Sequence, residues 1–212
     1  MVKGIKMNIN NFISSINKNG VARTNRFSVS FNLPTYLNSN KNEYGFNDKL
    51  ISYRCESAQL PGLALATVDG PPRLGYGAME SMPYNVTYDD LSLTFLMDSS
   101  TKLHKLFYDW MNCIVNFQGS HGQGSWNKSD NRFTKAAAYE VGYKVNYRTD
   151  IVIDVYDTND NHILTGTAYN AFPKILPSTD LAWSDQDALM KYTIPFSYTD
   201  FNTKYHRINV TK

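Results

Sequence analysis

The stretch from Tyr88 to Val115 constrains the fold most, because the pattern of a strand leads directly into the pattern of a long helix. From Leu91 to Met97 every second residue is apolar, which is typical of a strand with one buried face. The following Asp98-Ser99-Ser100 carries side-chain oxygens that can accept hydrogen bonds from the free N–H groups at a helix start. Apolar residues then recur at helical spacing, at Leu103, Leu106, Phe107, Trp110 and Ile114. We expect this helix to anchor the domain, because its aromatic side chains remove a large apolar area from water.

The same alternation predicts other strands. The clearest runs from Phe27 to Leu33, where every second residue is apolar. A hairpin is expected around the turn residues Thr158-Asn159-Asp160-Asn161. In its first strand Ile151, Ile153 and Val155 share one face, and Asp150 and Asp154 lie on the other. The expected hairpins are 150–157 with 163–170 and 181–184 with 189–198, and the expected single strands are 50–58, 63–69, 82–86 and 139–147.

The remaining segments are expected to be a short helix, two long loops and a tail. Ile9, Phe12, Ile13 and Ile16 predict an amphipathic helix of about two turns, which must dock on the domain or on a neighbour to be stable. The loops are 34–48 and 116–131, and the polar tail is 201–212.

Together these elements predict a mainly β fold. The aromatic content of 14%, with 15 tyrosines, favours strands over helices. We expect one domain over residues 1–212, built as a β-sandwich or open barrel of two antiparallel sheets. One long helix packs on it, and a short helix precedes it.

Charge and composition exclude several classes of protein. The formal charge of +2 and the absence of a Lys/Arg cluster argue against a protein that binds duplex nucleic acid. No stretch approaches the roughly 20 apolar residues of a membrane span, and no signal peptide is evident, so no membrane partner is expected. Cys55 and Cys113 lie in apolar settings and are interpreted as buried thiols, with a disulfide or a reactive site as the alternative.

No pattern of residues indicates catalysis, a cofactor or a metal. The four histidines lack the spacing of metal ligands. The Gly-rich stretch 118–125 lacks the Gly-Lys-Ser/Thr ending of a phosphate-binding loop. Asp157 to Asn161 resembles the start of a calcium loop, but His162 stands where glycine is needed. We therefore expect no enzyme, no cofactor and no metal site.

An ordered set of residues resembles a known family. The set comprises Ala22-Arg23-x-Asn25-x-Phe27, Cys55 with Ala58, Leu60 and Pro61, Tyr88-Asp89-Asp90, Asp98, Phe107 with Trp110, and Phe172-Pro173. In this order they resemble the inner tail-tube protein of contractile-tailed bacteriophages, whose fold is shared with the tube of type VI secretion. The sequence departs from the family at loop 34–48, at the Gly-rich stretch, after Phe201, and at Leu91, where the family often has Trp.

The resemblance implies a structural protein of the virion tail, assembled in the cytoplasm of the bacterial host. Six copies would form a ring, and stacked rings would form a hollow tube inside a sheath. The implied partners are other copies of the chain, sheath and baseplate proteins, and phage DNA that passes through the lumen without specific binding.

Particular residues have expected roles in such an assembly. Arg23, Asn25 and Arg26 are candidates for subunit contact, with satisfaction of a local turn as the alternative. Asp150 and Asp154 are candidates to face the lumen, because a basic lining would bind phosphates. An ordinary solvated strand face is the alternative. The expected core anchors are Phe27, Phe95, Phe107 and Trp110.

Two other functions stay open. A baseplate protein of the same fold could start the tube, and its copy number would be far lower than that of a repeating subunit. A carbohydrate-binding β-sandwich could use Trp126 and Trp183 as sugar platforms, and glycan binding by a monomer would favour it.

Overall fold

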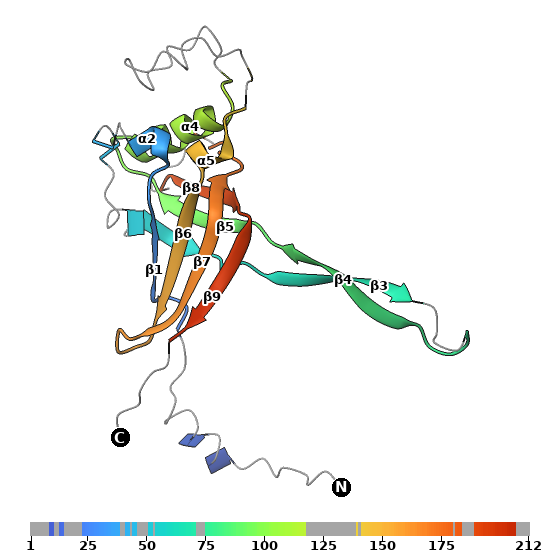
Figure 1. Cartoon of the computed structure of the whole chain (residues 1–212). Helices are drawn as coiled ribbons and strands as arrows, with labels where there is room; N and C mark the ends of the chain where they lie inside the picture. Colours follow the sequence, from blue (N-terminus) through green and yellow to red (C-terminus); the bar gives the residue numbers. More distant parts are fainter. Residues whose placement is uncertain are drawn as a thin grey trace.

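A seven-stranded antiparallel sheet, shared between two layers, forms the body of the molecule (Figure 1). The structure is a computed structural model, and it describes residues 9–10, 13–14, 23–38, 41–42, 44–45, 51–52, 54–70, 75–117, 139, 141–179, 181–183 and 189–206. The strands are β1 (Phe27–Phe31), β2 (Cys55–Ala58), β3 (Leu63–Gly70), β4 (Glu80–Tyr88), β5 (Leu91–Leu96), β6 (Thr149–Tyr156), β7 (His162–Pro173), β8 (Lys191–Ser197) and β9 (Asp200–Tyr205). The helices are α2 (Thr35–Asn38), α4 (Lys102–Ile114) and α5 (Lys144–Tyr147).

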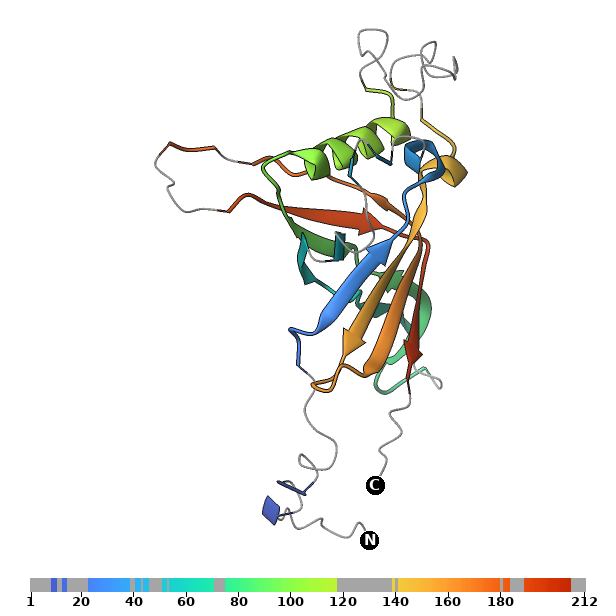
Figure 2. The same cartoon turned by 90° about the vertical axis from the view of Figure 1, so that its left-hand side faces the viewer.

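The longest strand, β7, belongs to both layers. Most of its length pairs with β6 on one side and β9 on the other, and β6 also pairs with β1. The last two residues, Phe172 and Pro173, pair instead with β8, which continues through β5 to β2. The two layers are therefore β9-β7-β6-β1 and β8-β5-β2, as Figure 2 shows from the side. This arrangement confirms the predicted mainly β class with antiparallel sheets.

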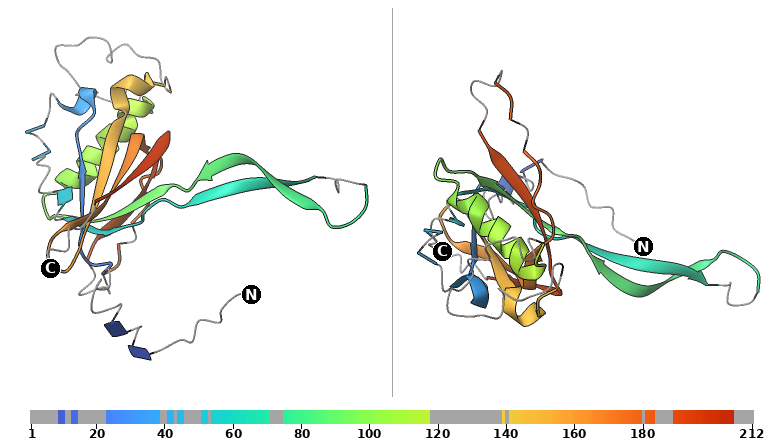
Figure 3. Two further views of the ribbon diagram at one scale, coloured as in Figure 1. Left: turned by 60° about the horizontal axis from the view of Figure 1, so that its bottom comes forward. Right: turned by 90° about the horizontal axis from the view of Figure 1, so that it is seen from above.

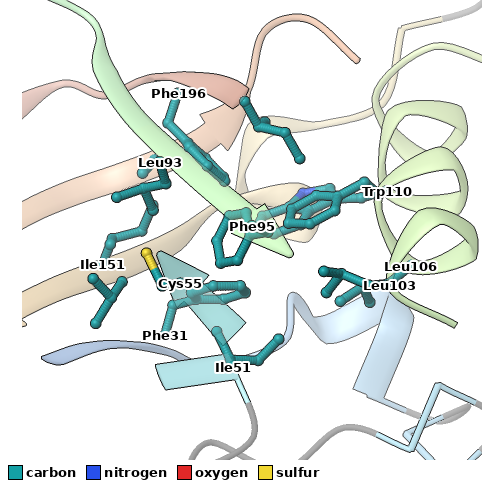
Figure 4. Packing of buried hydrophobic residues seen from close by; sticks show 14 of the residues in the cluster. Phe31, Ile51, Cys55, Leu93, Phe95, Leu103, Leu106, Trp110, Ile151 and Phe196 are labelled. Atoms are coloured by element: carbon teal, nitrogen blue, oxygen red, sulfur yellow. The ribbon is translucent and has the colours of Figure 1, made fainter. Parts of the chain in front are cut away.

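The core lies between the layers and under α4. Leu91, Leu93 and Phe95 of β5 are fully buried, as the alternation predicts, and Phe31 of β1 faces Phe196 of β8 across the core. Helix α4 covers the end of both layers and points Leu103, Leu106 and Trp110 toward them (Figure 4).

Three of the four expected anchors lie in this core, and one lies at its margin. Phe95, Phe107 and Trp110 are almost fully buried, whereas Phe27 is half-buried and packs against the edge of the cluster. The indole of Trp110 stacks with Phe107 at a centroid distance of 6.2 Å, and its Nε1 donates a hydrogen bond of 2.7 Å to the carbonyl of Tyr147. Trp110 therefore joins the helix to the segment that leads into β6.

The predicted tail 201–212 was wrong over its first part, because residues 200–205 form an edge strand of the first layer, and residues 207–212 lie outside the described ones. β9 pairs with β7 from Leu164↔Tyr205 to Tyr169↔Asp200. Phe201 is half-buried, and its ring lies against Gly166 of β7. A Cβ atom added at residue 166 would lie only 2.8 Å from the ring. A glycine in β7 thus makes room for the one aromatic residue that holds β9 in place.

The predicted strand over residues 139–147 was also wrong. Val141 makes an isolated bridge with Val115, and the chain then turns into α5. The side chains of Tyr139, Val141, Tyr143 and Val145, which alternate in sequence, are exposed and pack on no sheet among the described residues. The carbonyl of Tyr147 bonds to Trp110 instead of to a neighbouring strand.

Three more boundaries differ from the sequence prediction. The predicted loop 34–48 contains α2, and Leu37 and Tyr44 are buried, with the Tyr44 hydroxyl donating to Asp109 of α4 at 2.9 Å. The predicted strand 50–58 begins only at Cys55, because residues 51, 52 and 54 are helical. Residues 181–183 are exposed and make no hairpin with β8. Most of the predicted first helix lies outside the described residues. So do residues 118–131 of the predicted loop 116–131.

Helix α4 begins differently from the prediction. Its N-cap is Thr101, in the left-handed region at φ 53°, and the Thr101 side chain makes no capping bond. Asp98, three residues before Thr101, accepts a hydrogen bond from the main-chain N–H of Leu103 in the first turn of the helix. Burial raises the pKa of its carboxyl, but the Ser100 hydroxyl, the Arg54 guanidinium at 3.3 Å and the main-chain N–H of Leu103 outweigh burial, so the pKa is lowered overall.

This lowered pKa predicts a pH-dependent contribution to stability. A carboxyl whose pKa is lower in the folded chain stabilises the fold above its unfolded pKa and loses that effect as the pH falls through the folded value. We expect Asp98→Asn to lower the free energy of unfolding at neutral pH and to match the unmodified chain at about pH 2. Urea unfolding of both chains across this range measures the difference, and a difference that is constant with pH would contradict the assignment.

Candidate functional site

The layer β9-β7-β6-β1 ends in two free edges. β1 pairs only with β6, and β9 pairs only with β7, so within the described residues no strand covers the outer edge of either. Two hydrogen bonds show which main-chain groups of the edge strands already have a partner. The Arg26 carbonyl accepts from the Tyr156 N–H and the His206 N–H donates to the Ile163 carbonyl, each at 2.9 Å. Because an antiparallel ladder uses alternate residues, the main-chain groups of Phe27, Val29, Phe31, Phe201, Thr203 and Tyr205 face outward.

The two free edges run in opposite directions. Each neighbouring pair in this layer is antiparallel, and three such pairings separate β9 from β1. If identical layers are placed side by side in the same orientation, β1 of one meets β9 of the next antiparallel. Unpaired edges of this kind are templates for pairing with another chain. The layer is therefore able to continue into a copy of itself.

The outward face of this layer is mostly polar, with Val152, Tyr156 and Tyr169 as its larger side chains. Cross-strand partners place Ser28, Asp154, Thr165 and Lys204 in one row, and Ser30, Val152, Thr167 and Asn202 in the next. The Thr165 hydroxyl donates to Asp154 Oδ1 at 2.7 Å. Asp150 lies on the same strand face and accepts a bond of 2.9 Å from the Asn170 N–H. Within the four strands this face carries Asp150, Asp154 and Asp200 against Lys204, and Arg26 lies at its end, just before β1.

The expected subunit-contact residues lie beside β1. Arg23 and Asn25 are exposed in the turn before the strand. Arg26 forms an ion pair with Asp160 in the turn between β6 and β7. The structure thus gives Arg26 a partner within its own chain and leaves Arg23 and Asn25 on the surface.

A second feature was missed by sequence reasoning. Strands β3 and β4 pair only with each other and project from the body as a long two-stranded arm (Figure 1; Figure 3). Every residue of β4 is exposed. Large apolar side chains are nevertheless frequent on the arm, at Leu63, Leu65, Val68, Met82, Tyr84, Val86 and Tyr88. A lone two-stranded hairpin is marginally stable in water, so this surface is suited to a partner.

The root of the arm is fixed to the body. The Tyr88 ring packs against Tyr198 at 5.9 Å, and the Tyr198 hydroxyl donates to the Asp89 carbonyl at 2.7 Å. Burial, followed by the nearby Asp89, raises the pKa of Tyr198 to about 12. Lys174 bonds to Asp90 at 2.8 Å. These contacts fix the base of the arm to the body.

The described part of the chain offers neither a reactive thiol nor a cluster of metal ligands. Cys55 and Cys113 are free and buried; burial raises the pKa of Cys55 to about 12 and also raises the pKa of Cys113. Such thiols are poor nucleophiles. Among the described residues no three His, Cys, Asp or Glu side chains are placed to hold a metal, and none of the described helices is long and apolar enough to cross a membrane. Trp110 is in the core, Trp183 is fully exposed, and Trp126 lies outside the described residues.

Comparison with known proteins gives a family. A family model described as phage tail tube protein matches residues 22–204. A search of curated protein sequences finds no match. This range contains β1, the whole arm and all of β9 except its last residue, Tyr205.

Several solved structures share this fold at low sequence identity. A chain in the cryo-EM structure of the anti-feeding prophage (AFP) baseplate is 14% identical, with a TM-score of 0.57 over 88% of this chain and 97% of that one. A chain in the PVC sheath-tube complex, an extracellular contractile injection system, is 16% identical, with a TM-score of 0.55 over 91% and 97%. A chain of the AFP tube-terminating cap is 14% identical, with a TM-score of 0.55 over 88% and 92%. At these identities the likeness shows a shared fold.

Proposed function

The chain belongs to the phage tail tube protein family, and from this membership we propose that it is the repeating subunit of the inner tube of a contractile tail. The observation that carries the proposal is the layer with two free, oppositely directed edges. One subunit cannot satisfy these edges, whereas identical copies around an axis satisfy all of them.

We propose that the closed assembly is a ring of six. β1 of each copy pairs with β9 of the next, and the four strands of each layer join into one antiparallel barrel. A head-to-tail contact of this kind forms a closed ring when its rotation closes. Closure removes the exposed edges, which is the general advantage of a barrel. Rings then stack into a tube, and sheath and baseplate proteins surround and nucleate it.

The polar face of the layer is proposed to line the lumen. Its opposite face carries Ile151 and Ile153 into the core, so only the face with Asp150 and Asp154 is available to a central channel. An excess of carboxylates would repel phosphates, which lets DNA slide through during delivery. The single Lys204 lies in the same row as Asp154. A positive lumen surface at Asp150 and Asp154 in an assembled ring would contradict this part.

Electron microscopy of the purified protein tests the proposal. We expect isolated protein to be monomeric or to form rings, and we expect hollow tubes when baseplates are added as a template. Protein that stays monomeric on baseplates would overturn it.

A second candidate is a baseplate protein of the same fold that starts the tube. It is favoured by the similarity to a chain in a baseplate structure. Counting copies per virion by quantitative mass spectrometry separates the two, because an initiator fills only one or two rings. For a repeating subunit we expect a copy number per virion that grows with the length of the tail.

A further inference from the structure

Three side chains connect the end of β9 to the inner strands of its layer. Asp154 of β6 accepts a hydrogen bond of 2.7 Å from the Thr165 hydroxyl of β7. The same hydroxyl oxygen lies 2.9 Å from Nε2 of His206, the residue that follows β9. We call this set of His206, Thr165 and Asp154 the edge link, because it reaches from the edge strand across β7 to β6.

The single proton of the Thr165 hydroxyl sets the direction of both bonds. An ionised carboxylate only accepts hydrogen bonds, so this proton points to Asp154. The Thr165 oxygen therefore accepts at its other contact, and Nε2 of His206 carries a proton and donates. Every group of the edge link thus has the role that its neighbour requires. Hydrogen bonds connected through one hydroxyl in this way strengthen each other.

A second histidine reaches the edge link through a bulge in β7. The regular register of β6 and β7 breaks after Val155, and Ile163 is the extra residue in β7. His162 is thereby placed opposite Tyr156, and the two rings pack edge to face at a centroid distance of 4.5 Å. The His162 ring also lies 5.6 Å from the His206 ring, at an angle of 89°. β7 thus holds the His206 imidazole with two side chains.

The second half of β9 has little else to hold it beyond its main-chain ladder with β7. The start of the strand is fixed by Phe201, which packs on β7. Farther along, the side chains of Lys204 and Tyr205 are exposed. Within the described part of the chain, this half and the residue after it make one side-chain hydrogen bond, from His206 to Thr165. A strand end with so little apolar burial opens readily unless another contact fastens it.

We propose that the edge link positions β9 for pairing with the next copy, so that His206 and Thr165 are positioning residues of the assembly. The inference rests on the proposed function, in which β9 meets β1 of another subunit. A strand end that is open for part of the time lowers the apparent affinity by the fraction of time for which it is closed. Fastening β9 in the single chain removes this loss before a neighbour arrives. Asp154 then has a role inside its own layer, in addition to its proposed place at the lumen.

Substitutions at Thr165 test whether the edge link holds β9 in the monomer. Thr165→Val removes both hydrogen bonds and keeps the size of the side chain, whereas Thr165→Ser keeps the hydroxyl. Thr167→Val is the matched control, because Thr167 lies on the same strand and face and is also half-buried. Hydrogen exchange measured by NMR reports the opening of β9 through the His206 N–H, which donates to the Ile163 carbonyl.

We expect this N–H to exchange about three- to tenfold faster in Thr165→Val, which corresponds to the loss of one or two hydrogen bonds. We expect Thr165→Ser and Thr167→Val to stay within about twofold of the unmodified chain. The amides of β5, in the other layer, are the internal reference, since a general loss of stability would speed their exchange too.

Substitutions at His206 test which ring nitrogen acts. His206→Gln keeps an N–H donor at the reach of Nε2, whereas His206→Asn keeps a donor only at the reach of Nδ1. We expect the glutamine variant to exchange like the unmodified chain and the asparagine variant to exchange like Thr165→Val. The opposite order would overturn the assigned direction of the bonds.

Tube formation on baseplates, measured by sedimentation, tests the positioning role. We expect Thr165→Val to lower the assembled fraction at least about threefold at limiting protein concentration, and Thr165→Ser and Thr167→Val to assemble normally. Equal exchange in Thr165→Val and Thr167→Val would overturn the edge link. Faster exchange with full assembly would overturn its role in positioning. An unmodified chain that forms no tube would instead overturn the proposed function, and exchange in the monomer would still show whether the link fastens β9.

Discussion

Replacing Trp110 by alanine is expected to lower the free energy of unfolding by about 3–5 kcal/mol, because the indole fills the centre of the core. Its ring lies 5.8 Å from Phe31, 6.2 Å from Phe107 and 6.0 Å from Phe196, so both layers and α4 meet on it. The substitution also leaves the Tyr147 carbonyl without its 2.7 Å hydrogen bond. A buried acceptor without a partner adds a further cost.

The chain provides its own control for this experiment. Trp183 is fully exposed, so Trp183→Ala removes the same side chain without creating a cavity. Urea unfolding of the monomer, followed by circular dichroism, should separate the two variants clearly. Equal stability of the two variants would show that α4 does not hold the layers together.

Replacing Thr203 by proline is expected to abolish assembly while the monomer stays folded. The Thr203 N–H faces the outer edge of β9, so proline removes no bond of the ladder with β7. In the proposed ring it leaves a carbonyl of the neighbouring β1 unsatisfied, at a cost of about 1–3 kcal/mol per contact. That cost recurs at every contact of the ring. Sedimentation of protein incubated with baseplates measures the assembled fraction.

Two variants show whether the effect belongs to the edge. Thr203→Val keeps the N–H, and we expect it to assemble. Lys204→Pro removes a donor that faces β7, and we expect it to destabilise the monomer itself. Tubes of Thr203→Pro as abundant as those of Thr203→Val would place β9 outside the interface.

The elements that sequence predicts well are those whose pattern is long and whose partner is in the same chain. In β5 and α4 the apolar residues recur over many positions, and their burial follows the period of the strand and of the helix. The hairpin of β6 and β7 adds a turn of typical composition. Local information is sufficient in these cases.

β9 was missed because its docking depends on a contact between distant residues. Only Phe201 of the strand packs on the core side to a substantial extent, and the space for its ring exists because residue 166 is glycine. Neither residue indicates a strand alone. The loop 34–48 is similar, since Tyr44 is buried and its hydroxyl bonds to Asp109 of α4, which is distant in sequence.

The arm and the segment 139–145 show a different limit. Met82, Tyr84, Val86 and Tyr88 alternate as in a buried strand, yet all are exposed in the single chain. An alternating apolar pattern predicts that one side of a strand will be covered. It does not indicate whether the same chain or another chain covers it. For a subunit of an assembly, the mismatch between an apolar pattern and exposure is itself informative about the candidate site. The roles expected of Arg23, Asn25, Asp150 and Asp154 stay predictions, because they concern contacts and surfaces that a single chain does not contain.

The most direct measurement is a cryo-EM reconstruction of the tube grown from baseplates, at a resolution that separates strands. We expect β9 of each copy to continue antiparallel into β1 of the next, so that every layer joins one closed barrel. Tubes in which both edges face solvent, or a chain that stays single on the template, would contradict a subunit completed by its own copies.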